Sequence, residues 1–481
     1  MQVRRSLYIT LLSSNASALV MFALTLVLAR LLTPDDIGVF SVTVVFINIV
    51  AVFRDFGAGP YLVREKVLTP DKIRSVLGLL LTTSWVLAAA LFAASGPIAR
   101  YYGQPAITDV LHILTLSFLL VPYASVLSSL LMRDMQAGKS AIVTAASTAV
   151  YAATCLLLAW LDFGPLALAW ANTANLVTNI VGFYLVRPAD TPLRPAFHGW
   201  REPMRFGRGA IAGNLLTVTH AALPDLVLGK VQGTHEVGLY SRANGLVGLF
   251  QQVVGPAVSY NALPFIAQHH HAGTPLAPLL ARTTSYLTGL AWPAYLVIGM
   301  FAEPIVRLLY GQTWVQAVPL VPILCVAAAV RIGYSLSQPA LLAIGRPYLM
   351  ALSVGSNLAA RIAMLWWLGS NDLWTFALAL CIADAVSLPI PAWLMARHLG
   401  FSLRQSLAAH APSLAVTLAC AGAAGLLQAW LPAGWPPMAI VALVTLVIGL
   451  TWLAAVFGLR HPLREELVRL FQPLGQILRR Q

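Results

Sequence analysis

The sequence predicts an all-α integral membrane protein with about 14 transmembrane helices, arranged as two parallel six-helix lobes followed by two C-terminal helices. Three observations lead to this fold class. Of the 481 residues, 59% are hydrophobic and only 10% are charged, which is too little charge for the surface of a soluble protein. The apolar residues gather in fourteen segments of the length that a bilayer-crossing helix needs, roughly 20 residues. A sixteen-residue motif also recurs 200 positions further along the chain.

The predicted spans follow from dividing the chain where prolines, glycines and charges gather. The longest polar interruption, 187–206, contains four prolines and is predicted to be a cytoplasmic linker between the first lobe, 1–186, and the second, 207–400. Two additional spans lie within 401–458, and 459–481 is an amphipathic cytoplasmic tail. The predicted spans are 7–29, 37–58, 75–99, 108–132, 140–161, 164–186, 207–229, 238–265, 279–302, 317–344, 348–369, 373–396, 409–431 and 437–458.

The first of these spans resembles a secretory signal, because Arg4 and Arg5 precede it. Its apolar run is too long for a signal peptide, and no small-residue cleavage site follows. We therefore interpret it as an uncleaved span.

Nothing in the sequence indicates a cofactor, a metal site or a disulfide framework. The four cysteines all lie in apolar stretches without metal-ligand spacing, so we interpret them as small core residues. The histidines at 269–271 fall in a predicted cytoplasmic loop and read as solvated polar sequence rather than as metal ligands.

The placement of lysine and arginine sets the predicted orientation. If the N-terminus is cytoplasmic, cytoplasmic segments hold 23 of the 30 basic residues and the outer loops hold four. The remaining three, Arg242, Arg331 and Arg361, fall inside spans. Both termini are therefore predicted to be cytoplasmic. The net charge of +13 follows from topology, so it gives no support to nucleic-acid binding.

The repeated motif reads LVLARLLTPDDIGVFS at 26–41 and LVLGKVQGTHEVGLYS at 226–241. An even number of predicted crossings separates the copies, so both leave the membrane on the same, outer side. The repeats are therefore parallel, related by an axis along the membrane normal.

Each copy of the motif ends one helix and begins the next. In the first copy Thr33 suits the N-cap, and Asp35 and Asp36 suit the positive end of the helix dipole. In the second copy Gly233 takes the cap and Glu236 the dipole position. We interpret the motif as structural. The alternative is an acidic metal site, as in polyprenyl-phosphate-dependent membrane glycosyltransferases, but the second copy retains only one of the two acids.

Three stretches carry a family resemblance: LARLLTPDDIGVFS at 28–41, FRDFGAGPYLVRE at 53–65 and GKVQGTHEVGLYSRANGL at 229–246. Together with two parallel six-span lobes and two extra spans, they resemble the MOP flippase superfamily, and within it the polysaccharide-transport branch that contains the Wzx-type flippases. The resemblance implies a bacterial inner-membrane protein that moves undecaprenyl-pyrophosphate-linked oligosaccharides for surface polysaccharide or lipopolysaccharide biosynthesis. It implies no bond chemistry and therefore no enzyme.

Charged residues inside spans are costly and usually face a cavity or a partner. Arg242, Arg331 and Arg361 are candidate ligands for a pyrophosphate in the substrate cavity. Asp225 and Asp384 are candidate charge partners or coupling groups. Asp384 lies near the depth of Arg331 and Arg361 and cannot neutralise both; a packed structural ion pair with one of them is the alternative. Asp225 and Arg242 lie at similar depth, so a structural ion pair is the alternative for them, and snorkelling to the outer surface is another for Arg242.

Two further residues of the seventh span are candidates. His220, midway along the span, is a candidate for proton relay, with a satisfied core histidine as the alternative. Pro224 is a gating candidate, because proline kinks or interrupts a helix.

The tail places Leu463, Leu467, Leu470 and Phe471 on one helical face. This pattern predicts an amphipathic helix on the anionic inner leaflet. A docking surface for a synthesis complex is the alternative.

The sequence as a whole predicts a lipid-linked oligosaccharide flippase that works by alternating access, with arginine holding the pyrophosphate and the polyprenyl tail left among the membrane lipids. A polysaccharide polymerase or assembly complex is the predicted protein partner. The glycan, the oligomeric state and the coupling ion, H⁺ or Na⁺, stay open. A multidrug or metabolite exporter of the same superfamily is one alternative. A polyprenyl-phosphate-dependent glycosyltransferase is another, although it needs larger outer loops than this chain offers.

Overall fold

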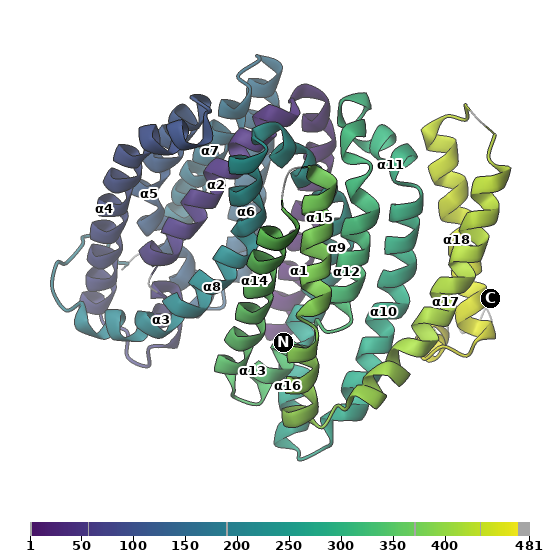
Figure 1. The fold of residues 1–481 in the computed structure, drawn as a ribbon. Helices are drawn as coiled ribbons and strands as arrows, with labels where there is room; N and C mark the ends of the chain where they lie inside the picture. Colours follow the sequence, from purple (N-terminus) through teal and green to yellow (C-terminus); the bar gives the residue numbers. More distant parts are fainter. Residues whose placement is uncertain (1, 56, 189–190, 370–371, 433, 470–481) are drawn as a thin grey trace, which may run out of the picture. The chain divides into compact units, whose positions relative to one another are not determined.

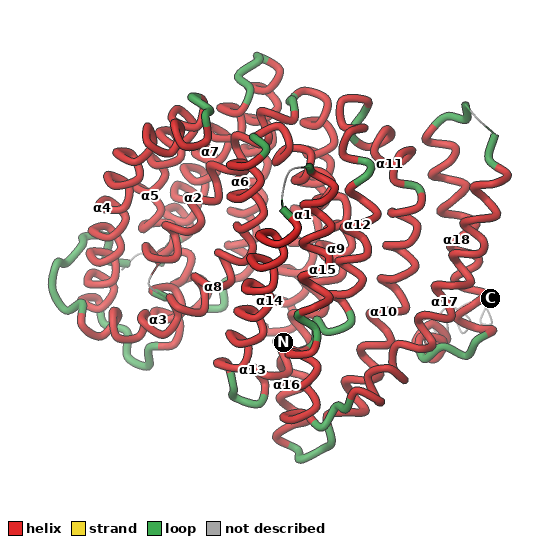
Figure 2. The backbone as a smooth tube through the Cα atoms, viewed as in Figure 1, coloured by secondary structure: helices red, strands yellow, loops and turns green. Residues whose placement is uncertain are grey.

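The computed structural model describes residues 2–469 apart from 56, 189–190, 370–371 and 433, and this part of the chain is helical without any strand (Figure 2). Its helices are α1 (Gln2–Leu31), α2 (Pro34–Asp55), α3 (Ala58–Arg64), α4 (Pro70–Tyr102), α5 (Ala106–Arg133), α6 (Ala137–Trp160), α7 (Pro165–Val186), α8 (Arg201–Val231), α9 (Thr234–His271), α10 (Leu276–Met300), α11 (Ala302–Leu309), α12 (Leu320–Ile332), α13 (Ser337–Ala343), α14 (Pro347–Leu368), α15 (Leu373–Val386), α16 (Pro389–Leu399), α17 (Leu403–Trp430) and α18 (Pro437–Gly458), with a short 3₁₀ helix at Gln312–Ala317 (Figure 1).

The predicted fold class is confirmed. Among the described residues, nine helices are long and apolar enough to cross a membrane, or ten if the bent pair of α10 and α11 forms one span. Each of the fourteen predicted segments falls on helix, but the count of fourteen crossings stays a prediction. The chain is a multi-pass, all-α membrane protein.

The chain forms two compact units, Met1–Ser241 and Arg242–Gln481. The first unit contains α1 to α8 and the first residues of α9. The predicted lobe boundary at 187–206 was drawn from the longest polar interruption of the sequence, and it stays a prediction.

Three predicted spans are each one candidate span, Pro34–Arg64, Leu320–Ala343 and Leu373–Leu399, but each contains a short break between two helices that the sequence analysis did not predict. The span 37–58 ends as α2 at Asp55 and is followed by the separate short helix α3. The span 317–344 is divided into α12 and α13, and the span 373–396 into α15 and α16. Proline explains the last break, because Pro389 has no N–H to donate and its ring clashes with the carbonyl four residues earlier.

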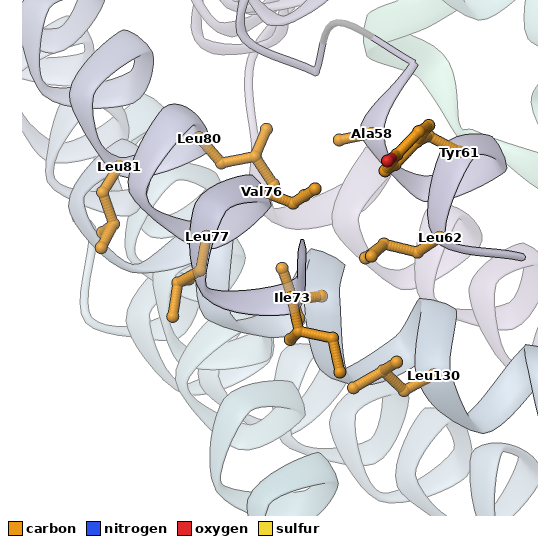
Figure 3. Packing of buried hydrophobic residues seen from close by; sticks show 10 residues of the cluster. Ala58, Tyr61, Leu62, Ile73, Val76, Leu77, Leu80, Leu81 and Leu130 are labelled. Carbon is orange, nitrogen blue, oxygen red and sulfur yellow. The ribbon is translucent and has the colours of Figure 1, made fainter. Parts of the chain in front are cut away.

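A cluster of buried apolar side chains holds α3 in place (Figure 3). On α3, Leu62 is fully buried against residues of α4 and α5. Arg133, at the end of α5, donates hydrogen bonds from Nη1 to the carbonyl oxygens of Leu62 (2.7 Å) and Glu65 (2.6 Å), which satisfies the free carbonyls at the helix end. The stretch 53–65 therefore has a structural role. The labelled members of the cluster are Ala58, Tyr61, Leu62, Ile73, Val76, Leu77, Leu80, Leu81 and Leu130.

The linker between α7 and α8 is anchored on α4. The backbone N–H of Ala196 donates to the carbonyl oxygen of Arg74 at 2.9 Å. Gly78 permits this approach, because a Cβ atom there would lie 2.1 Å from the carbonyl oxygen of Ala196.

The beginning of the C-terminal tail packs on the protein itself, which corrects the expectation that its apolar face lies in the leaflet. Leu463 is 7% exposed and belongs to the core cluster that includes Val416 of α17 and Phe301, and Leu467 packs against the same cluster. Leu470 and Phe471 lie outside the described residues. The apolar face is thus at least partly covered by the second unit's own helices.

His461 fixes this docking. Its Nδ1 accepts the backbone N–H of Leu463 (3.1 Å), and its Nε2 donates to the hydroxyl oxygen of Ser413 (3.1 Å). Nδ1 must be unprotonated to accept, so the arrangement requires the neutral ring. Burial of the side chain lowers the pKa of His461 and favours that form.

Candidate functional site

The two copies of the repeated motif contact each other through equivalent residues in the first unit. A Cβ atom on Gly38 would lie 1.7 Å from the carbonyl oxygen of Thr234, and one on Gly238 would lie 1.9 Å from the carbonyl oxygen of Pro34. Each glycine therefore admits the first turn of the other copy's helix. One turn further, Ser41 donates from Oγ to Oγ of Ser241 at 3.4 Å.

The carboxylates of Asp35 and Asp36 in the first copy both accept hydrogen bonds, Asp36 at the start of its own helix and Asp35 from the second copy. The backbone N–H and hydroxyl of Thr33 donate to Oδ2 of Asp36 (2.9 and 2.7 Å), and the backbone N–H of Asp36 donates to Thr33 Oγ1 (3.2 Å). Asp35 accepts from the hydroxyl of Thr234 (3.3 Å), and its Oδ2 lies 3.1 Å from His235 Nδ1. The predicted N-cap role of Thr33 and the predicted place of Asp35 and Asp36 in the first turn of α2 are confirmed.

In the second unit, Arg331, Arg361 and Asp384 come together as one cluster. Arg331 donates from Nη1 to Asp384 Oδ2 at 2.8 Å. Arg361 donates to Asp384 Oδ1 from both Nε (3.2 Å) and Nη2 (3.0 Å). Asn357, one helical turn before Arg361 on α14, donates to Asp384 Oδ1 (3.1 Å) and to Oγ of Ser387 (2.6 Å).

The two arginines of this cluster differ in how freely they present their charge. The side chain of Arg361 is 7% exposed and that of Asp384 is 1% exposed, whereas that of Arg331 is 45% exposed. One carboxylate faces two guanidinium groups, so a positive charge is left over. Because the side chain of Arg361 is buried, the exposed guanidinium of Arg331 carries the surplus positive charge that a ligand can reach.

Two helix breaks of the second unit, the α12–α13 break and the α15–α16 break, lie beside this cluster. Arg331 is the penultimate residue of α12, and Asp384 lies two residues before the end of α15. At membrane depth, irregular backbone is tolerated where it is buried in protein or lines a cavity, and transporters place substrate sites at such breaks. The arrangement is therefore typical of a transporter binding site.

Arg242 lies two turns into α9 and stacks on buried aromatic rings. Its guanidinium carbon is 5.5 Å from the ring centre of Trp314 and 5.9 Å from that of Tyr310. These cation–π contacts orient the guanidinium. Its predicted partner Asp225 belongs to the other unit, and their pairing stays a prediction.

The remaining candidates lie on α8. Asp225 lines a cavity of about 540 Å³ between α2 and α8. His220 is half-buried on the same helix. α8 continues from Arg201 to Val231 through Pro224, so the helix is not interrupted there; a kink at this proline and its gating role stay predictions.

The sequence analysis missed several polar residues beside these candidates. Asn357 is one turn from Arg361, and Ser387 is three residues after Asp384. A search for polar residues on the helical face of each intramembrane charge finds both. On α2, Ser41, Asn48 and Asp55 recur every seven residues, which is the signal of a polar face in an apolar helix.

The sequence of this chain is similar to proteins of polysaccharide biosynthesis. A family model described as "Polysaccharide biosynthesis protein" matches residues 27–319, more than half of the chain. The succinoglycan biosynthesis transport protein ExoT of Rhizobium meliloti is 25% identical over 396 residues, which cover 82% of this chain and 80% of that protein. The lipopolysaccharide biosynthesis protein WzxC of Escherichia coli is 22% identical over 310 residues, covering 63% and 62%.

Solved structures share the fold. The lipid II flippase MurJ in an inward closed conformation superposes with a TM-score of 0.72 at 12% sequence identity, covering 94% of this chain and 98% of that one. An inward-facing multidrug-resistance transporter of the MATE family superposes with a TM-score of 0.64 at 14% identity, covering 79% and 94%.

Proposed function

Because the chain belongs to the polysaccharide biosynthesis protein family, we propose that it is a flippase that moves a polyprenyl-diphosphate-linked oligosaccharide across the bacterial inner membrane by alternating access. The relatives named for succinoglycan transport and lipopolysaccharide biosynthesis support this substrate class. The observation that carries the proposal is the surplus positive charge at the two helix breaks, where a single carboxylate holds two guanidinium groups.

In this proposal Arg331 holds the diphosphate. Arg361 directs two donors at the buried Asp384 and serves as the anchor. Arg331 places one of its N–H groups on Asp384 and remains 45% exposed. A guanidinium presents a planar fork that matches two phosphate oxygens, and its charge acts more strongly where water is scarce. Arg242, oriented by its aromatic contacts, is the second proposed ligand.

The proposed process forms and breaks no covalent bond. The glycosyltransferase alternative depends on Asp35 and Asp36 as free acids, but both accept hydrogen bonds within the repeated motif. A multidrug exporter for hydrophobic cations needs an acidic site, whereas the cluster around Asp384 carries a surplus positive charge; of the two carboxylates among the described residues that line the cavity between α2 and α8, Asp55 is already paired with Arg54. The flippase is therefore the function that the geometry favours.

Vesicles reconstituted with the protein test this function. A labelled lipid-linked oligosaccharide should become accessible from the other side while its mass stays unchanged. We expect Arg331→Ala to slow this movement roughly ten- to a hundredfold, because a charge-assisted hydrogen bond contributes about 1.5–3 kcal/mol. The flipping rate of Arg331→Lys should lie between those of the wild-type protein and Arg331→Ala. Arg242→Ala should also flip the substrate more slowly than the wild-type protein.

The matched control is Arg307→Ala, which removes an arginine that pairs with Glu303 on α11 at 2.7 Å and lies outside the cluster. All rates are normalised to the amount of protein in the vesicles. A glycan product of altered mass would point to an enzyme. An Arg331→Ala variant as fast as the control would show that Arg331 does not hold the diphosphate.

We also propose that both termini are cytoplasmic and that a polysaccharide polymerase or assembly complex is the protein partner. The placement of basic residues supports this orientation, because the predicted cytoplasmic segments hold 23 of the 30 lysines and arginines. An impermeant thiol reagent added to intact spheroplasts should label Thr313→Cys and spare His270→Cys; the reverse pattern would invert the topology.

A further inference from the structure

Spaced polar side chains line both walls of the cavity between α2 and α8, here called the polar track. On α2, Ser41, Asn48 and Asp55 line it. They are seven residues apart, so they share one helical face and extend over about 21 Å at 1.5 Å per residue. On α8, Asn214 and Asp225 line the opposite wall. Both walls therefore carry polar groups at intervals among apolar lining residues.

The middle of the track presents two side-chain amides, those of Asn48 and Asn214, to the cavity. Asn48 and Asn214 are both exposed, and within the described residues neither side-chain amide has a hydrogen-bond partner. An unsatisfied amide facing lipid is costly. The two amides therefore require either water or a polar ligand in the cavity.

The charge of the track differs from that of the arginine cluster. Among the described residues that line the cavity there is no lysine or arginine. Asp225 lies toward the outer end of α8, and Asp55 at the other end of the cavity forms an ion pair with Arg54 at 2.7 Å. A diphosphate would be repelled by Asp225 and would find no cation among the lining residues. Amides, hydroxyls and carboxylates are instead suited to sugar hydroxyls, which both donate and accept hydrogen bonds.

We propose that the α2–α8 cavity is the subsite for the uncharged sugars of the cargo, with Asn48 and Asn214 as its central hydrogen-bonding groups. Its volume of about 540 Å³ lies within the range of small-molecule sites. The inference rests on the proposed function and deepens it, because it separates the site of the glycan from the site of the diphosphate. Asn48 and Asn214 then act as specificity-determining residues for the oligosaccharide.

Substrates that differ in glycan length test this separation. Flipping of polyprenyl diphosphate carrying the full oligosaccharide is compared with that carrying one sugar, in vesicles containing Asn48→Leu or Asn214→Leu. We expect each variant to slow the full-length substrate roughly three- to tenfold, the effect of one lost hydrogen bond. The single-sugar substrate should change less than twofold. Asn48→Gln should retain more activity than Asn48→Leu, because it keeps an amide.

The matched control is Asn172→Leu, an exposed position on α7 that does not line the cavity. It should leave both substrates unchanged. Equal slowing of both substrates by the Asn48 and Asn214 variants would overturn the glycan subsite, as would full activity of both variants on the long substrate.

A second measurement does not depend on transport. The thiol of Asn48→Cys should be protected from a small maleimide by free oligosaccharide and not by inorganic pyrophosphate. Protection by pyrophosphate alone would overturn the inference. If the wild-type protein flipped neither lipid-linked substrate, the proposed function would fail, and this labelling would still decide whether the cavity binds glycan.

Discussion

Replacing Asp384 with alanine is expected to remove most of the folded protein from the membrane. Asp384 is 1% exposed and holds both Arg331 and Arg361. Without it, the enclosed guanidinium of Arg361 loses its counter-charge, and removal of one partner from a buried ion pair costs about 3–5 kcal/mol. That loss approaches the total stability of many proteins, roughly 5–15 kcal/mol. The measurements are the yield of monodisperse protein in detergent and its Tm.

Asp372→Ala is the matched control on the same helix. Asp372 caps α15 by accepting the backbone N–H of Thr375 at 2.8 Å, and loss of such a cap costs about 1 kcal/mol. A double variant, Asp384→Ala with Arg361→Met, removes both charges and should recover most of the folded protein. If Asp384→Ala were as abundant and as stable as Asp372→Ala, the cluster would not be an essential ion-pair network.

Gly38→Ala is the second change with a large expected effect. The added Cβ would lie 1.7 Å from the carbonyl oxygen of Thr234 and 2.6 Å from its carbon. Both are backbone atoms, so no side-chain rotation relieves the clash and α9 must shift at its first turn. Overpacking usually costs about 1–3 kcal/mol, and we expect the upper end of that range. A clear fall in Tm should result.

Gly245→Ala provides the comparison, because no atom lies within 4 Å of a Cβ at that position of α9. Alanine is the better helix former by about 1 kcal/mol, so this variant should be at least as stable as the parent. Gly238→Ala should resemble Gly38→Ala, because the two glycines occupy equivalent places in the repeat. Equal Tm values for Gly38→Ala and Gly245→Ala would refute the close contact.

Hydropathy and local capping made much of the fold predictable. The fourteen apolar segments all fall on helix, and the cap at Thr33 forms with Asp36 as the motif indicated. The helix breaks were not predicted, although Pro389 was visible in the sequence, because hydropathy continues across a break. Leu463 was assigned to the leaflet, since an apolar helical face looks the same whether lipid or protein covers it.

From the sequence, the site could be predicted only as a set of charged residues inside apolar spans, where a charge is energetically costly. The sequence indicated that Asp384 could not neutralise both arginines near its depth. It could not show that Arg361 would be enclosed and Arg331 left 45% exposed, because that difference depends on how α12, α14 and α15 pack. The polar face of α2 was readable from its seven-residue spacing, but its partner wall on α8 required the tertiary structure.

The contact between the repeated motifs also bears on ancestry. Pro34 meets Gly238 while its counterpart Thr234 meets Gly38, which is the reciprocal pattern of an isologous dimer interface. A shorter ancestor encoding one copy would have carried this patch as a self-complementary surface, able to join two identical chains before gene duplication fused them. In the fused chain the two copies can change separately, but each glycine is still constrained by a backbone carbonyl oxygen of the other copy. We therefore expect homologous chains to keep glycine at both positions, because each position is in contact with the backbone of the other copy.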